Sequence, residues 1–147
     1  MRTEHADISS GTAEGVLREL GRYAVERGYT AEGYVEALLD READFPTGLS
    51  IPDASFGVAI PHADPDLVEQ EAVLLGLPSE PVAFDSMDDP DESVDAAAVL
   101  LLIASGSDGY NAFLSNLADL FQADGFIEAV RSQSSERVLE LVEENCL

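Results

Sequence analysis

The sequence contains no lysine and no tryptophan, and it has only one cysteine, Cys146. A single cysteine excludes an internal disulfide bond and a cysteine-based metal cluster. The two histidines, His5 and His62, lie far apart and have no cysteine partner, which argues against a zinc site. We therefore expect neither a metal nor a cofactor.

Long apolar segments are absent as well. The longest uninterrupted run, residues 96–104, spans nine residues, about half of the roughly 20 that a membrane-spanning helix needs. Residues 1–10 lack the apolar segment of a secretory signal. The sequence thus predicts a cytoplasmic protein that does not insert directly into a membrane.

Positive charge is scarce, because seven arginines face 30 acidic residues and the net charge is −23. Nucleic acids and anionic membranes need a basic patch, and scattered arginines do not form one, so neither is an expected partner. Such charge is common in disordered chains, but 46% hydrophobic residues favour a folded acidic domain. A salt-rich cytosol, as in a halophile, would screen the repulsion, since the Debye length is about 3 Å at 1 M salt.

The chain of 147 residues is long enough for one domain with a core of its own. We expect a flexible N-terminus over residues 1–10 and a single domain over residues 11–147. Apolar residues at three- and four-residue spacing predict a helix that follows Thr12 and that Gly28 ends. The tetrapeptide Thr-Ala-Glu-Gly recurs at Thr30, where we expect a second N-cap and a helix that Pro46 stops.

Strand-sized apolar runs occupy the middle of the chain, at residues 58–60, 72–77, 82–84 and 94–103. The last run is almost continuously apolar, which is typical of a strand buried on both faces. Three more helices are predicted in the C-terminal third, beginning at Asp108, Asp124 and Ser134. The predicted fold class is therefore α/β, with a β-sheet sandwiched between α-helices.

The segment between the last two predicted strands, residues 85–95, holds six acids among eleven residues. Calcium prefers oxygen ligands, but the EF-hand spacing is absent because the central glycine and the closing glutamate are missing. A salt-adapted surface loop is the favoured interpretation.

His62 ends the apolar segment Gly57–His62, where Pro61 fixes the backbone just before it. A neutral imidazole whose second nitrogen is hydrogen-bonded offers a fixed lone pair that can accept a phosphoryl group. Arg41 carries planar donors that match phosphate oxygens. The residues alone also allow a structural histidine and an arginine that pairs with surface acids.

The pattern from Arg41-Glu42 through Pro46-Thr47-Gly48 to Gly57–His62 resembles the IIA component of the bacterial-type sugar phosphotransferase system (PTS), in its fructose, mannitol and galactitol class (type 2). The resemblance extends from about residue 12 to residue 141 and implies a mixed β-sheet between helices. It implies that His62 takes phosphate from the phosphocarrier HPr and passes it to a IIB component, which serves a IIC membrane permease. It also implies that Arg41 stabilises the phosphate.

One departure from the family concerns a second histidine, which fructose and mannitol members usually place where this chain has Tyr110 and Asn111. Either one of these residues donates a hydrogen bond in its place, or the site functions without that donor; Thr47 is a further expected supporting residue. The absence favours a galactitol-like branch. An apolar rim of Phe45, Ile51 and Phe56 is the expected docking contact.

Two other functions remain open from the sequence. A regulatory protein of the nitrogen-related PTS branch would share the histidine but control a target protein through its phosphorylation state. An acidic binding domain without chemistry would keep every activity after replacement of His62.

Overall fold

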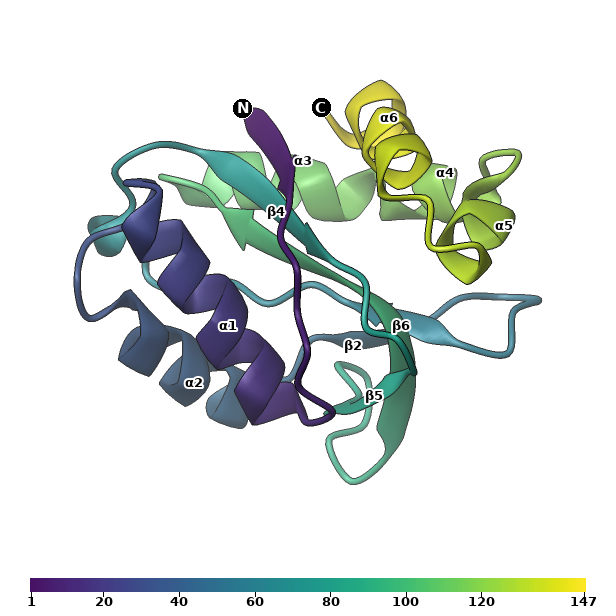
Figure 1. The fold of residues 1–147 in the computed structure, drawn as a ribbon, viewed down its shortest axis with the longest axis horizontal. Helices are drawn as coiled ribbons and strands as arrows, with labels where there is room; N and C mark the ends of the chain where they lie inside the picture. Colours follow the sequence, from purple (N-terminus) through teal and green to yellow (C-terminus); the bar gives the residue numbers. More distant parts are fainter.

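The computed structural model describes residues 1–147, apart from the side chain of Ser107. It has three layers, with a six-stranded sheet between two groups of helices (Figure 1). The strands are β1 (Arg2–His5), β2 (Gly48–Ser50), β3 (Gly57–Ala59), β4 (Ala72–Gly76), β5 (Val82–Asp85) and β6 (Ser93–Ile103). The helices are α1 (Ala13–Glu26), α2 (Tyr34–Asp44), a 3-10 turn η1 (Pro65–Leu67), α3 (Ser107–Ser115), α4 (Leu117–Gln122), α5 (Phe126–Arg131) and α6 (Ser135–Cys146). The predicted α/β sandwich is confirmed.

The sheet is mixed, and β6 lies at its centre. The strand order is β1-β4-β6-β3-β2, and β5 pairs with the first part of β6. Strand β6 runs antiparallel to β4 and β5 and parallel to β3. Its last six residues are all buried, as expected for a strand covered on both faces.

Each face of the sheet has its own apolar core. Side chains alternate along the strands, so Leu74 and Leu101 face α1 and α2, whereas Leu75 and Leu100 face α3–α6. In Figure 1, α1 and α2 lie together on one side of the sheet and α3–α6 on the other. Burial of each leucine contributes about 1.5–3 kcal/mol, so the two cores hold both helical layers against the strands.

The predicted helix starts are right in two cases. The hydroxyl of Thr12 accepts a hydrogen bond from the Gly15 N–H at 3.1 Å, and Ser134 is the N-cap of α6. The start at Thr30 is wrong, because Thr30 forms a β-bridge to Val68 and α2 begins only after Gly33. Tertiary pairing therefore overrides the capping signal there.

The starts at Asp108 and Asp124 are also wrong. Gly106 and Gly125 are the N-caps of α3 and α5. Asp108 lies in the first turn of α3 instead, where its negative charge still favours the positive end of the helix dipole.

Residues 2–5, within the N-terminus expected to be flexible, form strand β1. Its residues pair in parallel with β4, from Arg2 beside Ala72 to His5 beside Leu75. The Thr3 hydroxyl donates to the Glu143 carboxylate of α6, which brings the two ends of the chain together (Figure 1). A short polar strand at a sheet edge has no apolar pattern, so composition could not reveal it.

Two glycines allow close contact between the chain segments that lead to His62. A Cβ atom on Gly48 would lie 2.7 Å from the Asp85 carbonyl oxygen, and one on Gly57 would lie 2.2 Å from the Leu49 carbonyl oxygen. Strands β2 and β3 therefore fit against each other, and β2 against the end of β5, only without side chains at these positions.

No helix in the described part of the chain is both long and apolar enough to cross a bilayer.

Candidate active site

The backbone around His62 is held on both sides. After β3, the Ile60 N–H donates to the Thr47 carbonyl oxygen at 3.2 Å, and the Leu102 N–H donates to the Pro61 carbonyl oxygen at 3.0 Å. The segment that follows β3 thus remains bound to β6. His62 therefore projects from a fixed support at the end of the sheet.

One ring nitrogen of His62 faces a backbone carbonyl. Its Nδ1 lies 3.4 Å from the Ile60 oxygen, a long hydrogen bond. A carbonyl oxygen can only accept, so we assign the proton of the neutral ring to Nδ1. The lone pair is then on Nε2, which is free to act as a nucleophile.

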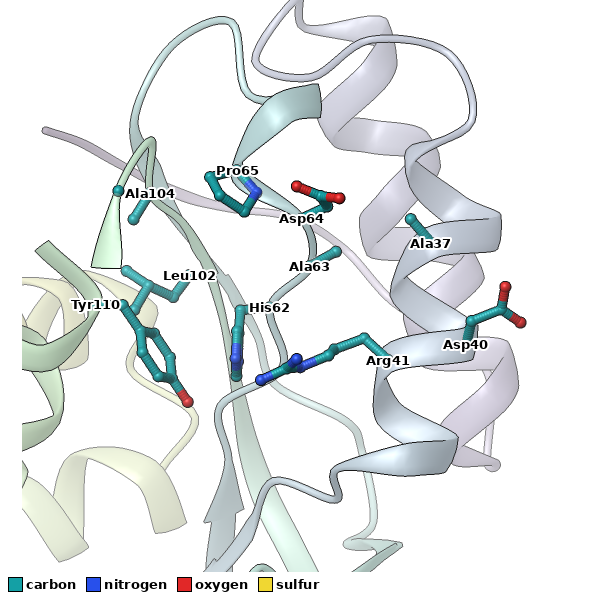
Figure 2. Close-up of a pocket in the computed structure, with 11 residues that line it drawn as sticks. Ala37, Asp40, Arg41, His62, Ala63, Asp64, Pro65, Leu102, Ala104 and Tyr110 are labelled. Carbon is teal, nitrogen blue, oxygen red and sulfur yellow. The ribbon is translucent and has the colours of Figure 1, made fainter. Parts of the chain in front are cut away.

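Tyr110 and Arg41 lie on opposite sides of the His62 imidazole (Figure 2). The Tyr110 ring, from α3, has its centroid 3.9 Å from the imidazole centroid, with the planes tilted by 35°. Arg41 extends from the last turn of α2, and its guanidinium carbon lies 4.2 Å from the centroid of the Phe45 ring. Side chains from two helices, α2 and α3, therefore meet at the imidazole that follows β3.

The surroundings keep His62 neutral. Burial lowers the pKa of His62 below its ordinary value; the Ile60 carbonyl opposes this effect, and the charge of Arg41 adds to it. Burial also raises the pKa of Tyr110, an effect that Arg41 opposes and Glu42 reinforces. At neutral pH the site thus presents an unprotonated nitrogen beside a guanidinium and a phenol O–H donor.

Two cavities meet at these three residues. The larger, of about 600 Å³, also contains the acidic side chains of Asp40 and Asp64 (Figure 2). The smaller, of about 290 Å³, lies toward Phe45. Arg41, His62 and Tyr110 line both cavities, so a group bound to His62 can be reached from the surface.

Arg41 and Tyr110 both lie beside His62 in the structure. The other two supporting candidates, Thr47 and Asn111, are not placed to bind a ligand. Thr47 lines the smaller cavity, yet its hydroxyl donates to Glu42 at 2.7 Å and is not free for a ligand. Asn111 is exposed on α3 and lies outside the described lining of both cavities.

The expected apolar rim is only partly present. Phe45 is 57% exposed and lines the smaller cavity. Ile51 is wrong as a docking residue, because it is 2% exposed and belongs to the core beneath α3–α6. Phe56 packs against that core and lies beside Arg131, outside both cavities.

Glu42 is a site-adjacent residue to which the sequence assigned no role. Its two carboxylate oxygens accept the Thr47 N–H at 2.8 Å and the Thr47 O–H at 2.7 Å. Burial raises the pKa of Glu42 to about 7 against the lowering effect of these bonds, and the charge of Asp85 raises it further. The only hint of a role for Glu42 in the sequence was that it stands next to Arg41.

In the described part of the chain, no group of three or more histidine, cysteine or acidic side chains is placed to hold a metal ion. Burial raises the pKa of Cys146 to about 11, and the charge of Asp119 adds to this, so the thiol stays protonated at neutral pH.

A neutral imidazole held beside a guanidinium in an open cavity is suited to carry an anionic group on the histidine. Residues 3–145 match the family model described as "Phosphoenolpyruvate-dependent sugar phosphotransferase system, EIIA 2". The chain belongs to this family. It is a phosphotransferase component of sugar uptake that acts by histidine phosphoryl transfer.

Relatives with curated names come from two branches. The chain is 29% identical over 136 residues to the PTS system fructose-specific EIIA component of Haloferax volcanii, covering 90% of this chain and 84% of that one. It is 33% identical over 88 residues to the PTS system galactitol-specific EIIA component of Escherichia coli K12, covering 60% of this chain and 57% of that one.

Solved structures share the whole fold. Enzyme IIAMtl in its complex with phosphorylated enzyme IIBMtl from Escherichia coli matches with a TM-score of 0.74 and 25% identity, over 97% of this chain and 94% of that one. The nitrogen regulatory protein IIA-Ntr from Neisseria meningitidis matches with a TM-score of 0.70 and 26% identity, over 95% and 92%. The mixed sheet between helices is therefore that of the mannitol IIA structures.

Proposed function

We propose that His62 is the residue that carries the phosphoryl group. The observation that supports this most directly is the position of its imidazole between the Arg41 guanidinium and the Tyr110 ring (Figure 2). Nε2 forms a bond to phosphorus while the bond between phosphorus and the donor atom breaks, and the donor atom keeps the electron pair of that bond. The proton on Nδ1 stays in place, hydrogen-bonded to Ile60.

Arg41 and Tyr110 stabilise the group in transfer. The phosphoryl oxygens carry negative charge, and a guanidinium offers them planar, permanently charged donors. The phenol adds one neutral donor, because it remains protonated at neutral pH. Thr47 supports the site structurally and does not bind the phosphoryl group, because its hydroxyl donates to Glu42.

The partners are phospho-HPr as donor and a IIB component as acceptor, through which a IIC permease is served. The IIB assignment is supported by the solved complex of the mannitol relative with its phosphorylated IIB protein. We place the reaction in the cytoplasm. We also propose that residues 11–147 act together with strand β1 as one domain, because β1 extends their sheet.

A regulatory protein of the nitrogen branch is the alternative, because IIA-Ntr shares the fold and a similar identity. The two functions differ in the phosphate acceptor. A sugar component passes its phosphoryl group to a cognate IIB protein, whereas a regulator binds a target according to its phosphorylation state.

We further propose a salt-rich cytoplasm as the working environment. Only three arginine–carboxylate ion pairs occur among the described residues, and 30 acids outnumber the seven arginines. Most carboxylates therefore have no cationic partner, and salt must screen their repulsion.

Phosphorylation in a reconstituted relay tests the proposal. The protein is incubated with phosphoenolpyruvate, the general donor enzyme and HPr, and its intact mass is measured. We expect one acid-labile phosphoryl group on the parent and on His5→Gln, and none on His62→Gln. Subsequent loss of the group to an added IIB protein separates the sugar component from the regulator. Labelling of His62→Gln at the parental rate would contradict the proposal.

A further inference from the structure

Glu42 is a half-buried carboxylate that the transfer chemistry does not use. It follows Arg41 in the last turn of α2 and accepts two hydrogen bonds from Thr47, on the other side of the turn that leads into β2. Thr47 is only 1% exposed. The pair therefore closes the turn between the helix that carries Arg41 and the strand pair that carries His62.

Hydrogen bonds continue from this pair to the imidazole. The Thr47 carbonyl oxygen accepts the Ile60 N–H at 3.2 Å. The carbonyl oxygen of the same Ile60 faces Nδ1 of His62 at 3.4 Å. A shift of Thr47 would therefore move the carbonyl that determines which nitrogen of His62 holds the proton.

We infer that Glu42 is a positioning residue for phosphoryl transfer, which acts through Thr47 and Ile60 to hold the His62 ring with Nε2 free in the cavity that Arg41 also lines. The inference rests on the proposed function of His62. It adds a residue that touches neither the phosphoryl group nor the imidazole.

The charge state of Glu42 matters to this arrangement. A carboxylate accepts both Thr47 donors at once, whereas a protonated carboxyl has an O–H of its own to place. The titratable groups whose charges interact with it are Asp85 at the end of β5 and Tyr110 on α3, and Arg41 precedes it in α2. Positioning is therefore sensitive to pH near neutrality.

The test uses four variants of the full chain. Glu42→Ala removes both acceptors, and Glu42→Gln keeps one acceptor for the Thr47 N–H and offers its amide to the hydroxyl. Thr47→Val keeps the N–H and removes the hydroxyl. Glu36→Ala is the matched control, because Glu36 is an exposed carboxylate on the same helix with the same charge change.

The first measurement is spectroscopic and needs no phosphate. Histidine ¹⁵N chemical shifts report which nitrogen of His62 is protonated. We expect Nδ1–H in the parent, Glu36→Ala and Glu42→Gln, and a mixture of tautomers in Glu42→Ala. An intact amide spectrum and cooperative unfolding show that each variant is folded.

The second measurement is the rate of phosphate acceptance from phospho-HPr. We expect Glu42→Ala to lower kcat about tenfold to hundredfold with little change in KM, as for loss of orientation. Thr47→Val should fall between it and the parent, and Glu42→Gln should restore most of the rate while losing the pH dependence near neutrality.

A folded Glu42→Ala protein with parental tautomer and parental kcat would overturn the inference. Failure of the proposed function has a different signature, because the parent itself would then accept no phosphate while the tautomer still responded to Glu42.

Discussion

The imidazole of His62 and the phenol ring of Tyr110 lie in contact, with centroids 3.9 Å apart and planes tilted by 35°. The resemblance to fructose- and mannitol-type members implied a second histidine in this region, where this chain has Tyr110. A tyrosine there covers the imidazole and donates one hydrogen bond, but it does not become positively charged. Arg41 is thus the one cationic side chain among the described residues that line the cavities.

Replacement of Tyr110 separates packing from hydrogen bonding. Tyr110→Phe keeps the ring contact and loses the hydroxyl, so we expect phosphate acceptance to slow about threefold to tenfold, the value of one hydrogen bond. Tyr110→Ala also exposes the imidazole to water and should shorten the lifetime of the phosphorylated protein. Rapid-quench transfer and the decay of the adduct measure the two effects. Parental rates in both variants would leave Tyr110 without a role.

Replacement of Arg41 should change the titration of His62. The positive charge of Arg41 helps to hold the pKa of His62 below its ordinary value. Arg41→Gln should therefore raise that pKa, and it should lower the rate of phosphate acceptance because the charged donors are gone. An NMR titration of the imidazole measures the first effect. Arg22→Gln, with an exposed arginine on α1, is the matched control, and an equal shift there would show that only net charge matters.

The stability of the protein should carry a pH dependence from Glu42. Its pKa is raised from 4.5 to about 7 in the folded state. The stabilisation of the folded state by the protonated carboxyl is therefore complete below pH 4.5 and is lost as the pH rises through 7. From pH 4.5 to 8, the free energy of unfolding of Glu42→Gln should gain roughly 2 to 3 kcal/mol relative to the parent. Urea unfolding of both proteins at each pH measures this difference. If the difference in unfolding free energy between the two proteins stays the same at every pH, burial does not penalise the charge of Glu42.

Salt should stabilise the fold. A net charge of −23 repels itself in dilute buffer, and the Debye length falls from about 10 Å at 0.1 M to about 3 Å at 1 M salt. We expect the midpoint of urea unfolding to rise with KCl over this range, and phosphate transfer from HPr to become faster. Sucrose at equal osmolality serves as the control without screening. A midpoint that is insensitive to KCl would contradict a salt-rich working environment.

The central strands and most helices were predictable because their apolar patterns are strong. The continuous apolar run of β6 and the periodic face of α1 indicate burial directly. Strands β1 and β2 were missed because each is short and gains its stability from a neighbour, not from its own sequence. The start of α2 was misplaced because Thr30 pairs with Val68, 38 residues away in the chain.

Part of the site was also predictable. Arg41 and His62 have chemistry that a phosphoryl carrier needs, and the resemblance linked them. The role of Glu42 and the buried position of Ile51 depend on how α2 and the β2–β3 hairpin pack, which no local pattern encodes. Asn111 and Tyr110 are neighbours in the sequence, and only the helix orientation decides which of them reaches the cavity.

The most direct test of the account is the location of the phosphoryl group in the protein labelled with ¹⁵N-histidine. After reaction with phospho-HPr, we expect a ³¹P coupling to Nε2 of His62, unchanged shifts for His5, and a proton retained on Nδ1 of His62. A phosphoryl group on His5, on Nδ1 of His62 or on a residue other than histidine would contradict it.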